Sequence, residues 1–131
     1  MKKAIVTGAA GHIGYHVANI LLEKGYEVHL LVRSINTNIT DLQAAGAMVY
    51  PCNLLEPDSY AAQLQDADVL FHLAAENTTS MANAERVLKN TDQLTRVVLQ
   101  AAHEAQVKTV IYTSSVVVIG RSSDPTRLLN E

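Results

Sequence analysis

The sequence has 131 residues, of which 48% are hydrophobic and 18% are charged, a composition typical of one globular domain rather than of a disordered or fibrous chain. Its formal net charge of −3 offers no broad basic surface for nucleic acid or anionic lipid, and no run approaches the roughly 20 apolar residues of a membrane span. The single cysteine, Cys52, cannot form an internal disulfide, and no cysteine and histidine residues have the spacing of a zinc site. We therefore expect a protein of the reducing cytoplasm without a bound metal.

Five short apolar runs predict five β-strands. The runs are mostly continuous rather than alternating, which is typical of parallel strands that helices cover on both faces. They comprise residues 4–6, 28–32, 47–50, 69–73 and 109–113.

A helix is predicted after the first run, because small and apolar residues fall on one helical stripe. These residues are Ile13, Gly14, Val17, Ile20 and Leu21. Gly25 is the residue expected just beyond the last turn of this helix.

Three further helices are predicted between the later runs. Residues 40–46 form a short helix that ends at a glycine, residues 57–64 a helix with proline in its first turn, and much of 81–106 a long helix. The long helix is expected to bury Val87, Leu88, Leu94, Val97, Val98, Ala101 and Ala102. Alternating strands and helices imply right-handed crossovers and a parallel sheet, so the fold class is α/β.

Residues 7–14, Thr-Gly-Ala-Ala-Gly-His-Ile-Gly, join the first strand to the first helix. Glycines let the backbone approach a pyrophosphate closely, and a helix N-terminus supplies free N–H groups and the positive end of a dipole. We expect Gly8 to make the tight turn, Gly11 to allow the close approach and Gly14 to bring the helix against the strand. The other predicted contacts are Ala10, His12 and Ile13. Because this turn follows a strand and opens a helix, nucleotide binding is favoured over an ordinary turn.

The glycine spacing is Gly-x-x-Gly-x-x-Gly, and here the sequence resembles the extended short-chain dehydrogenase/reductase family, which includes nucleotide-sugar epimerases and dihydroflavonol-reductase-like enzymes. Four segments carry the resemblance in the family's order and cover nearly the whole chain. They are residues 7–14, 21–28, 68–75 and 107–115, with Gly120 after them. The resemblance implies a Rossmann-like, doubly wound parallel sheet with strands one to five present, truncated at the C-terminus, so that residues 1–131 are the N-terminal part of a dinucleotide-binding domain.

The residues after the second strand bear on the choice of dinucleotide. An NAD site places a carboxylate there for the ribose 2′-hydroxyl, but no acid follows this strand before Asp41. Arg33 is instead a cation suited to the 2′-phosphate of NADP, with Ser34 and Asn36 as further donors. A charge-assisted contact of about 1.5–3 kcal/mol would favour NADP roughly 10- to 100-fold. The alternatives are that Arg33 is solvated on a loop and that the cofactor is NAD.

Two further cofactor contacts follow from the resemblance. Asn53-Leu54 stands where the family usually has Asp-Leu, whose acid accepts from the adenine amino group; an asparagine amide can do the same, although Asn53 is alternatively a turn residue. Ala74 and Ala75 end the fourth strand, where the family has small residues because the cofactor lies against the backbone; close packing also explains them. Asn90 is assigned no role, because its match to the family's Asn-x-x-Gly-Thr stretch is displaced by one residue.

By the same resemblance, Ser115 matches the serine that hydrogen-bonds the substrate carbonyl or hydroxyl, with Ser114 beside it. The alternative is a polar strand end capped by its own hydroxyls. In the family this serine works with a downstream Tyr-x-x-x-Lys, whose lysine lowers the pKa of the proton-exchanging tyrosine. No tyrosine follows Tyr112 and no lysine follows Lys108. We therefore expect the chain alone to be inactive, as part of a longer enzyme or as a truncated product.

The expected function is the dinucleotide-binding portion of an oxidoreductase that transfers hydride between NADPH and a small-molecule carbonyl or alcohol, with a homodimer as the expected assembly. Arg33 favours a reductase over the sugar epimerases, which usually keep NAD bound. Two alternatives remain: a non-catalytic dinucleotide sensor or regulatory module of the same fold, and a fragment of an NAD-dependent nucleotide-sugar epimerase or dehydratase.

Overall fold

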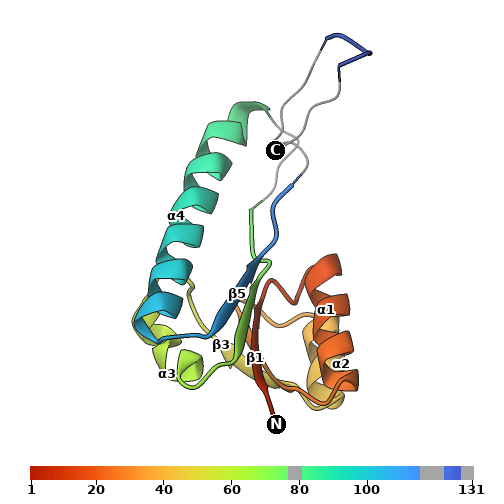
Figure 1. The fold of residues 1–131 in the computed structure, drawn as a ribbon, viewed down its shortest axis with the longest axis vertical. Helices are drawn as coiled ribbons and strands as arrows, with labels where there is room; N and C mark the ends of the chain where they lie inside the picture. The colour runs from red at the N-terminus through yellow and green to blue at the C-terminus, as the bar shows by residue number, and fades with distance from the viewer. Residues whose placement is uncertain (77–80, 116–122, 128–131) are drawn as a thin grey trace.

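A computed structural model describes residues 1–76, 81–115 and 123–127, and it contains one five-stranded parallel sheet of order β3-β2-β1-β4-β5 (Figure 1). The strands are β1 (Lys3–Thr7), β2 (Glu27–Val32), β3 (Met48–Pro51), β4 (Val69–His72) and β5 (Thr109–Tyr112). Each observed strand end lies within one residue of its predicted position, so the predicted α/β class and strand content are confirmed.

Helices cover both faces of the sheet, as a doubly wound fold requires. In Figure 1, α1 (His12–Glu23) and α2 (Thr37–Ala44) lie on one side, and α3 (Ala61–Leu64) and α4 (Ala84–Glu104) on the other. Neighbouring strand residues therefore enter different cores: Val6 and Leu30 pack with α1 and α2, whereas Ile5 and Leu31 pack with α3 and α4. This two-sided burial explains why the strand sequences are continuously apolar.

The second predicted helix begins earlier than expected. It starts at Thr37 rather than residue 40, because the Asn36 side chain caps it: Asn36 Oδ1 accepts a hydrogen bond from the Ile39 N–H at 3.1 Å. The prediction of one helix over 57–64 was also wrong. A short 3₁₀ turn, η1 (Pro57–Ser59), precedes α3, and the break falls at Tyr60, whose φ is −141°. Tyr60 is fully buried and its hydroxyl donates to the Leu54 carbonyl at 2.9 Å.

Some large apolar residues on the predicted helical stripes are exposed. On α1, Ile13 and Ile20 are 59% and 49% exposed, whereas the residues buried on this helix are Gly14, Ala18 and Leu21. The small residues allow α1 to pack closely on the sheet, which turns the isoleucines outward. On α4, which follows the turn η2 (Met81–Asn83), Leu88 is 71% exposed. The residues buried on α4 are Val87, Val98, Ala101 and Ala102, as predicted, and Leu94 and Val97 are half-buried.

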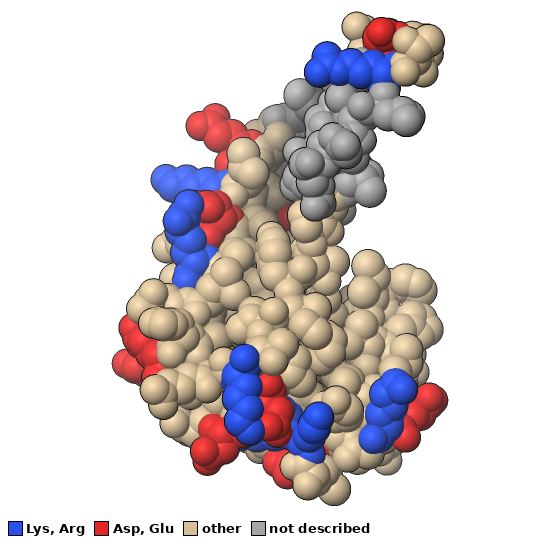
Figure 2. Space-filling model, viewed as in Figure 1, with Lys and Arg blue, Asp and Glu red and all other residues tan. Residues whose placement is uncertain are grey.

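The surface carries both charge signs in mixture. On the face seen in Figure 2, positive and negative side chains lie next to one another, and no large area has a single sign. Asp68, the residue before β4, accepts from the Lys3 backbone N–H at 2.8 Å and pairs with the Lys108 Nζ at 2.5 Å. Within the described part of the chain, no helix is long and apolar enough to cross a membrane.

Candidate functional site

A cleft of about 480 Å³ opens at the carboxyl ends of the strands. Its walls are the glycine turn after β1, the segments that follow β2, β3 and β4, and the facing side of α4. Nine of the residues predicted to contact a cofactor line it: Gly8, Ala10, Gly11, Arg33, Ser34, Asn53, Leu54, Ala74 and Ala75. The fold thus brings together residues from four separate segments, at the edge where open α/β sheets bind ligands.

Two of the three glycines are required by the packing of the turn itself. Gly8 has a φ of +76°, and a Cβ there would lie 2.7 Å from the backbone nitrogen of Ala74. At Gly14 a Cβ would lie 2.1 Å from the Gly8 carbonyl oxygen, so α1 reaches its position only with glycine there. Gly11 differs, because a Cβ would meet only the Gly8 oxygen, at 3.4 Å. Gly11 is exposed and lines the cleft, so its lack of a side chain keeps the approach to the backbone open.

The N-terminus of α1 borders this cleft without a side-chain cap. Its N-cap residue is Gly11, no side chain accepts from its first N–H groups, and no acidic residue lies in its first turn. A helix start of this kind offers free donors and the positive end of the helix dipole to an anion. His12 and Ile13 have exposed side chains and do not line the cleft, so their available contribution is the backbone N–H. The His12 ring instead packs edge-on against His16, at a centroid distance of 4.8 Å.

Arg33 and Ser34 follow β2 and are both exposed in the cleft. Arg33 makes no ion pair with any side chain in the described ranges. Asn36, predicted as a further donor, has another role: its Nδ2 donates to the Ala10 carbonyl at 3.1 Å while its Oδ1 caps α2. Asn38 Nδ2 donates to the same Ala10 carbonyl at 3.1 Å, so the start of α2 fixes the glycine turn.

Asn53 lines the cleft, but its amide serves a local turn. The Oδ1 accepts from the Leu55 N–H at 3.1 Å, and the Nδ2 donates to Glu56 Oε1 at 3.2 Å. The structure thus supports the turn interpretation that the sequence left open. Cys52, beside it in the cleft wall, was not predicted there; burial raises the pKa of its thiol and so favours the protonated form.

The segment after β4 forms the wall opposite Arg33. The Thr7 hydroxyl oxygen accepts the backbone N–H groups of Leu73 and Ala74, both at 3.1 Å, and so holds this segment against the glycine turn. Glu76 ends the wall and contacts α4. The α4 residues of the cleft were not predicted, although the displaced match at Asn90 pointed to this part of the helix. They are Asn90, Thr91 and Leu94.

Ser114 and Ser115 lie just beyond β5, at the same carboxyl edge of the sheet. Both are exposed, and neither is among the residues that line the cleft. Gly120, which the resemblance placed after them, is outside the described residues. The assignment of Ser115 to the substrate therefore stays a prediction.

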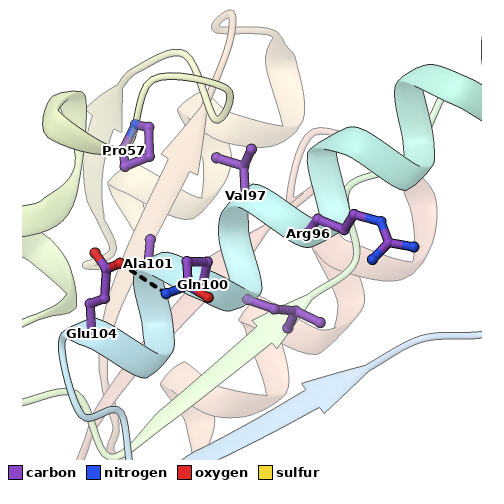
Figure 3. Close-up of a pocket in the computed structure, with 7 residues that line it drawn as sticks. Pro57, Arg96, Val97, Gln100, Ala101 and Glu104 are labelled. Carbon is purple, nitrogen blue, oxygen red and sulfur yellow. Dashed lines mark hydrogen bonds between the residues drawn. The ribbon is translucent and has the colours of Figure 1, made fainter.

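A second hollow of about 640 Å³ lies between η1 and α4 (Figure 3). Its walls include Pro57, Val97 and Ala101, and Gln100 Nε2 donates to Glu104 Oε1 at 2.9 Å along its rim. No predicted site residue lines it, and it is made by η1 and α4 rather than by the strand ends. Although this hollow is larger, the cleft at the strand ends therefore remains the candidate site.

Comparison with known proteins agrees with this geometry. The sequence profile of the NAD dependent epimerase/dehydratase family matches residues 4–130. Cinnamoyl-CoA reductase 2 of Arabidopsis thaliana is 32% identical over 121 residues, covering 88% of this chain and 36% of the relative. A putative dihydroflavonol 4-reductase of Synechocystis is 33% identical over 122 residues, covering 93% and 35%.

Among solved structures, UDP-glucose 4-epimerase from Bifidobacterium longum, in complex with NAD⁺ and UDP, superimposes with a TM-score of 0.81 at 25% identity. The match covers 95% of this chain and 40% of the epimerase chain. The chain thus spans little more than a third of the length of the curated relatives that it matches. The family profile covers nearly all of it, and the chain belongs to the NAD-dependent epimerase/dehydratase family of extended short-chain dehydrogenases/reductases.

Proposed function

We propose that residues 1–131 are the dinucleotide-binding portion of an NADP-dependent reductase that acts on a small-molecule carbonyl or alcohol in the cytoplasm. The observation that carries the proposal is the cleft in which an uncapped helix N-terminus and Arg33 occur together. A helix N-terminus suits a pyrophosphate, and a planar guanidinium suits the extra 2′-phosphate of NADP.

In this proposal, different residues of the cleft bind different parts of the cofactor. The backbone N–H groups at the start of α1 bind the pyrophosphate, with Gly11 leaving room for it. Arg33 and Ser34 bind the 2′-phosphate, and Ala74 and Ala75 form a flat wall without large side chains. NADPH, when bound, supplies the hydride.

The carbonyl substrate and the NADP preference belong to the same proposal. Support for a reductase comes from the relatives named as cinnamoyl-CoA and dihydroflavonol reductases and from the absence of an acidic residue between the end of β2 and Asp41. In this proposal Ser115, exposed at the same sheet edge, hydrogen-bonds the substrate oxygen. The tyrosine and lysine that the family places downstream are not in residues 116–131.

Calorimetric titration of the chain with NADPH and with NADH tests the proposal, and it needs no tryptophan, of which the chain has none. We expect NADPH to bind roughly 10- to 100-fold more tightly than NADH. Arg33→Gln should remove most of that difference and leave NADH binding nearly unchanged. Arg96→Gln is the matched control, because Arg96 is an exposed arginine on α4 outside the cleft. Equal binding of the two cofactors would refute the role of Arg33, and binding of neither would refute the site.

A further inference from the structure

Glu76 places a negative charge inside the cleft. It ends the wall that follows β4, and its two carboxylate oxygens contact α4: Oε1 lies 2.7 Å from Arg86 Nη1, and Oε2 accepts from Asn90 Nδ2 at 3.0 Å. Glu76 and Arg86 remain partly exposed, with side chains 39% and 57% accessible. The pair is therefore solvated, which screens its charges, but the Glu76 carboxylate itself lines the cleft.

Glu76 and Arg33 line the same cleft. Hydrogen bonds from Asn90 and Arg86 lower the pKa of the Glu76 carboxyl, and the positive charge of Arg33 lowers it further. The electrostatic interaction is reciprocal, so the ionised carboxylate of Glu76 repels an anion bound at Arg33. Of these three charged residues, Arg33 and Glu76 line the cleft, whereas Arg86 does not line it and forms an ion pair with Glu76.

We propose that Glu76 is a specificity-determining residue that weakens binding of the 2′-phosphate at Arg33, and that Arg86 limits this effect by neutralising Glu76. This inference rests on the proposed binding of NADP in the cleft. A 2′-phosphate carries more negative charge than the ribose hydroxyl of NADH at that position, so the field of Glu76 discriminates between the two cofactors. Across a solvated cleft, one unit charge changes the affinity for such a group by about 3- to 10-fold.

A purely structural role for Glu76 makes a different prediction. If its contacts only clamp the wall against α4, loss of either partner loosens the wall and weakens both cofactors. If its charge matters, loss of Glu76 and loss of Arg86 have opposite effects on NADPH. The sign of the two changes therefore separates an electrostatic role from a structural one.

The experiment measures NADPH and NADH affinities of the whole 131-residue chain and of its Glu76→Gln and Arg86→Gln variants by calorimetry. Glutamine keeps the size of Glu76 and one of its two acceptor oxygens while removing its charge. The matched control is Asp92→Asn, which removes an acid from an exposed ion pair with Arg96 elsewhere on α4 (2.9 Å). Urea unfolding confirms that each variant is folded. Titrations at about 50 mM and about 300 mM NaCl test screening, because the Debye length shortens to several ångströms over that range.

We expect Glu76→Gln to bind NADPH about 3- to 10-fold more tightly and NADH less than about 2-fold differently, and Arg86→Gln to weaken NADPH. The changes should shrink at the higher salt concentration, and Asp92→Asn should behave as the wild type. Weaker NADPH binding by both variants, equal changes for both cofactors, or changes insensitive to salt overturn the inference while leaving the proposed function intact. Wild-type chain that binds neither cofactor, or binds both equally, overturns the inference together with the NADP site.

Discussion

The Thr7 hydroxyl lies 2.8 Å from Nδ1 of the His72 ring, in the core beneath the cleft. Its oxygen already accepts two backbone N–H groups, from Leu73 and Ala74, so the hydroxyl proton is directed to Nδ1. His72 is therefore neutral, with its proton on Nε2. One threonine thus joins β1, the end of β4 and the wall of the candidate site.

Replacing Thr7 with valine should destabilise the chain by about 2–4 kcal/mol, because two half-buried backbone N–H groups and one buried ring nitrogen lose their partner. The change preserves the shape of the side chain, so packing is nearly unaffected. Urea unfolding monitored by circular dichroism measures the loss. Thr7→Ser is the control: it keeps the hydroxyl and should cost about 1 kcal/mol for the missing methyl group. Equal losses in the two variants would show that the hydroxyl network contributes nothing.

The free energy of unfolding should decrease as the pH is lowered, because of His72. Burial lowers the pKa of its imidazole to about 4, from an ordinary 6.5, and no described group pairs with its Nε2. Between these values the unfolded chain binds a proton that the folded chain does not, so the free energy of unfolding decreases as the pH falls. The loss is absent above about pH 6.5 and approaches about 3 kcal/mol near pH 4.

Urea unfolding of the wild type and of His72→Asn between about pH 7 and pH 5 isolates this contribution. Asparagine retains an acceptor near the position of Nδ1 but does not titrate. Its free energy of unfolding should be lower at neutral pH and should vary less with pH than that of the wild type. Parallel pH profiles for the two proteins would contradict the assignment of a neutral, buried His72.

The glycines of the turn should respond differently to alanine. At Gly14 the new Cβ would meet the Gly8 carbonyl oxygen at 2.1 Å, so Gly14→Ala should displace α1 and cost about 3 kcal/mol or more. At Gly11 the nearest atom is 3.4 Å away, and loss of the N-cap glycine should cost about 1 kcal/mol or less. Because Gly11 lines the cleft, Gly11→Ala should nevertheless weaken NADPH binding by about tenfold.

Thermal unfolding together with NADPH titration distinguishes these effects. Gly11→Ala should melt near the wild-type temperature and bind poorly, whereas Gly14→Ala should lose stability. A Gly11→Ala variant that binds as tightly as the wild type would show that a cofactor does not approach the backbone there.

The strands of the sheet were predictable because burial on both faces leaves a local signal in the sequence. A strand buried on both faces must be continuously apolar, and Ile5 and Val6, which enter different cores, show that both faces are covered. The glycine turn and the positions of Arg33 and Ser34 were predictable for the same reason, since strand ends fix them.

The roles of the polar side chains in the cleft could not be predicted, because they depend on neighbouring groups whose positions the sequence does not reveal. Asn36 and Asn53 each have an amide suited to a ligand, but one caps α2 and the other closes a turn, because the nearest unpaired N–H groups are in the backbone. Glu76 could be recognised as a cleft residue only from the fold, which places α4 beside the segment after β4. Ile13 and Ile20 were misplaced because Ala18 and Gly14 decide which side of α1 lies against the sheet.

The end of α4 offers a stabilising substitution. After α1 and α2 the chain turns at Gly25 and Gly46, whose φ values are +77° and +110°, but after α4 it turns at Gln106, with φ +56°. In this turn the Val107 N–H donates to the Ala102 carbonyl at 3.0 Å. Glutamine is strained in this left-handed conformation, so Gln106→Gly should raise the free energy of unfolding by about 0.5–1 kcal/mol, net of the greater freedom of glycine in the unfolded chain. Urea unfolding measures the gain, and Gln106→Ala, which keeps a Cβ, should give none. A destabilised glycine variant would mean that the Gln106 side chain contributes more to folding than its backbone strain costs.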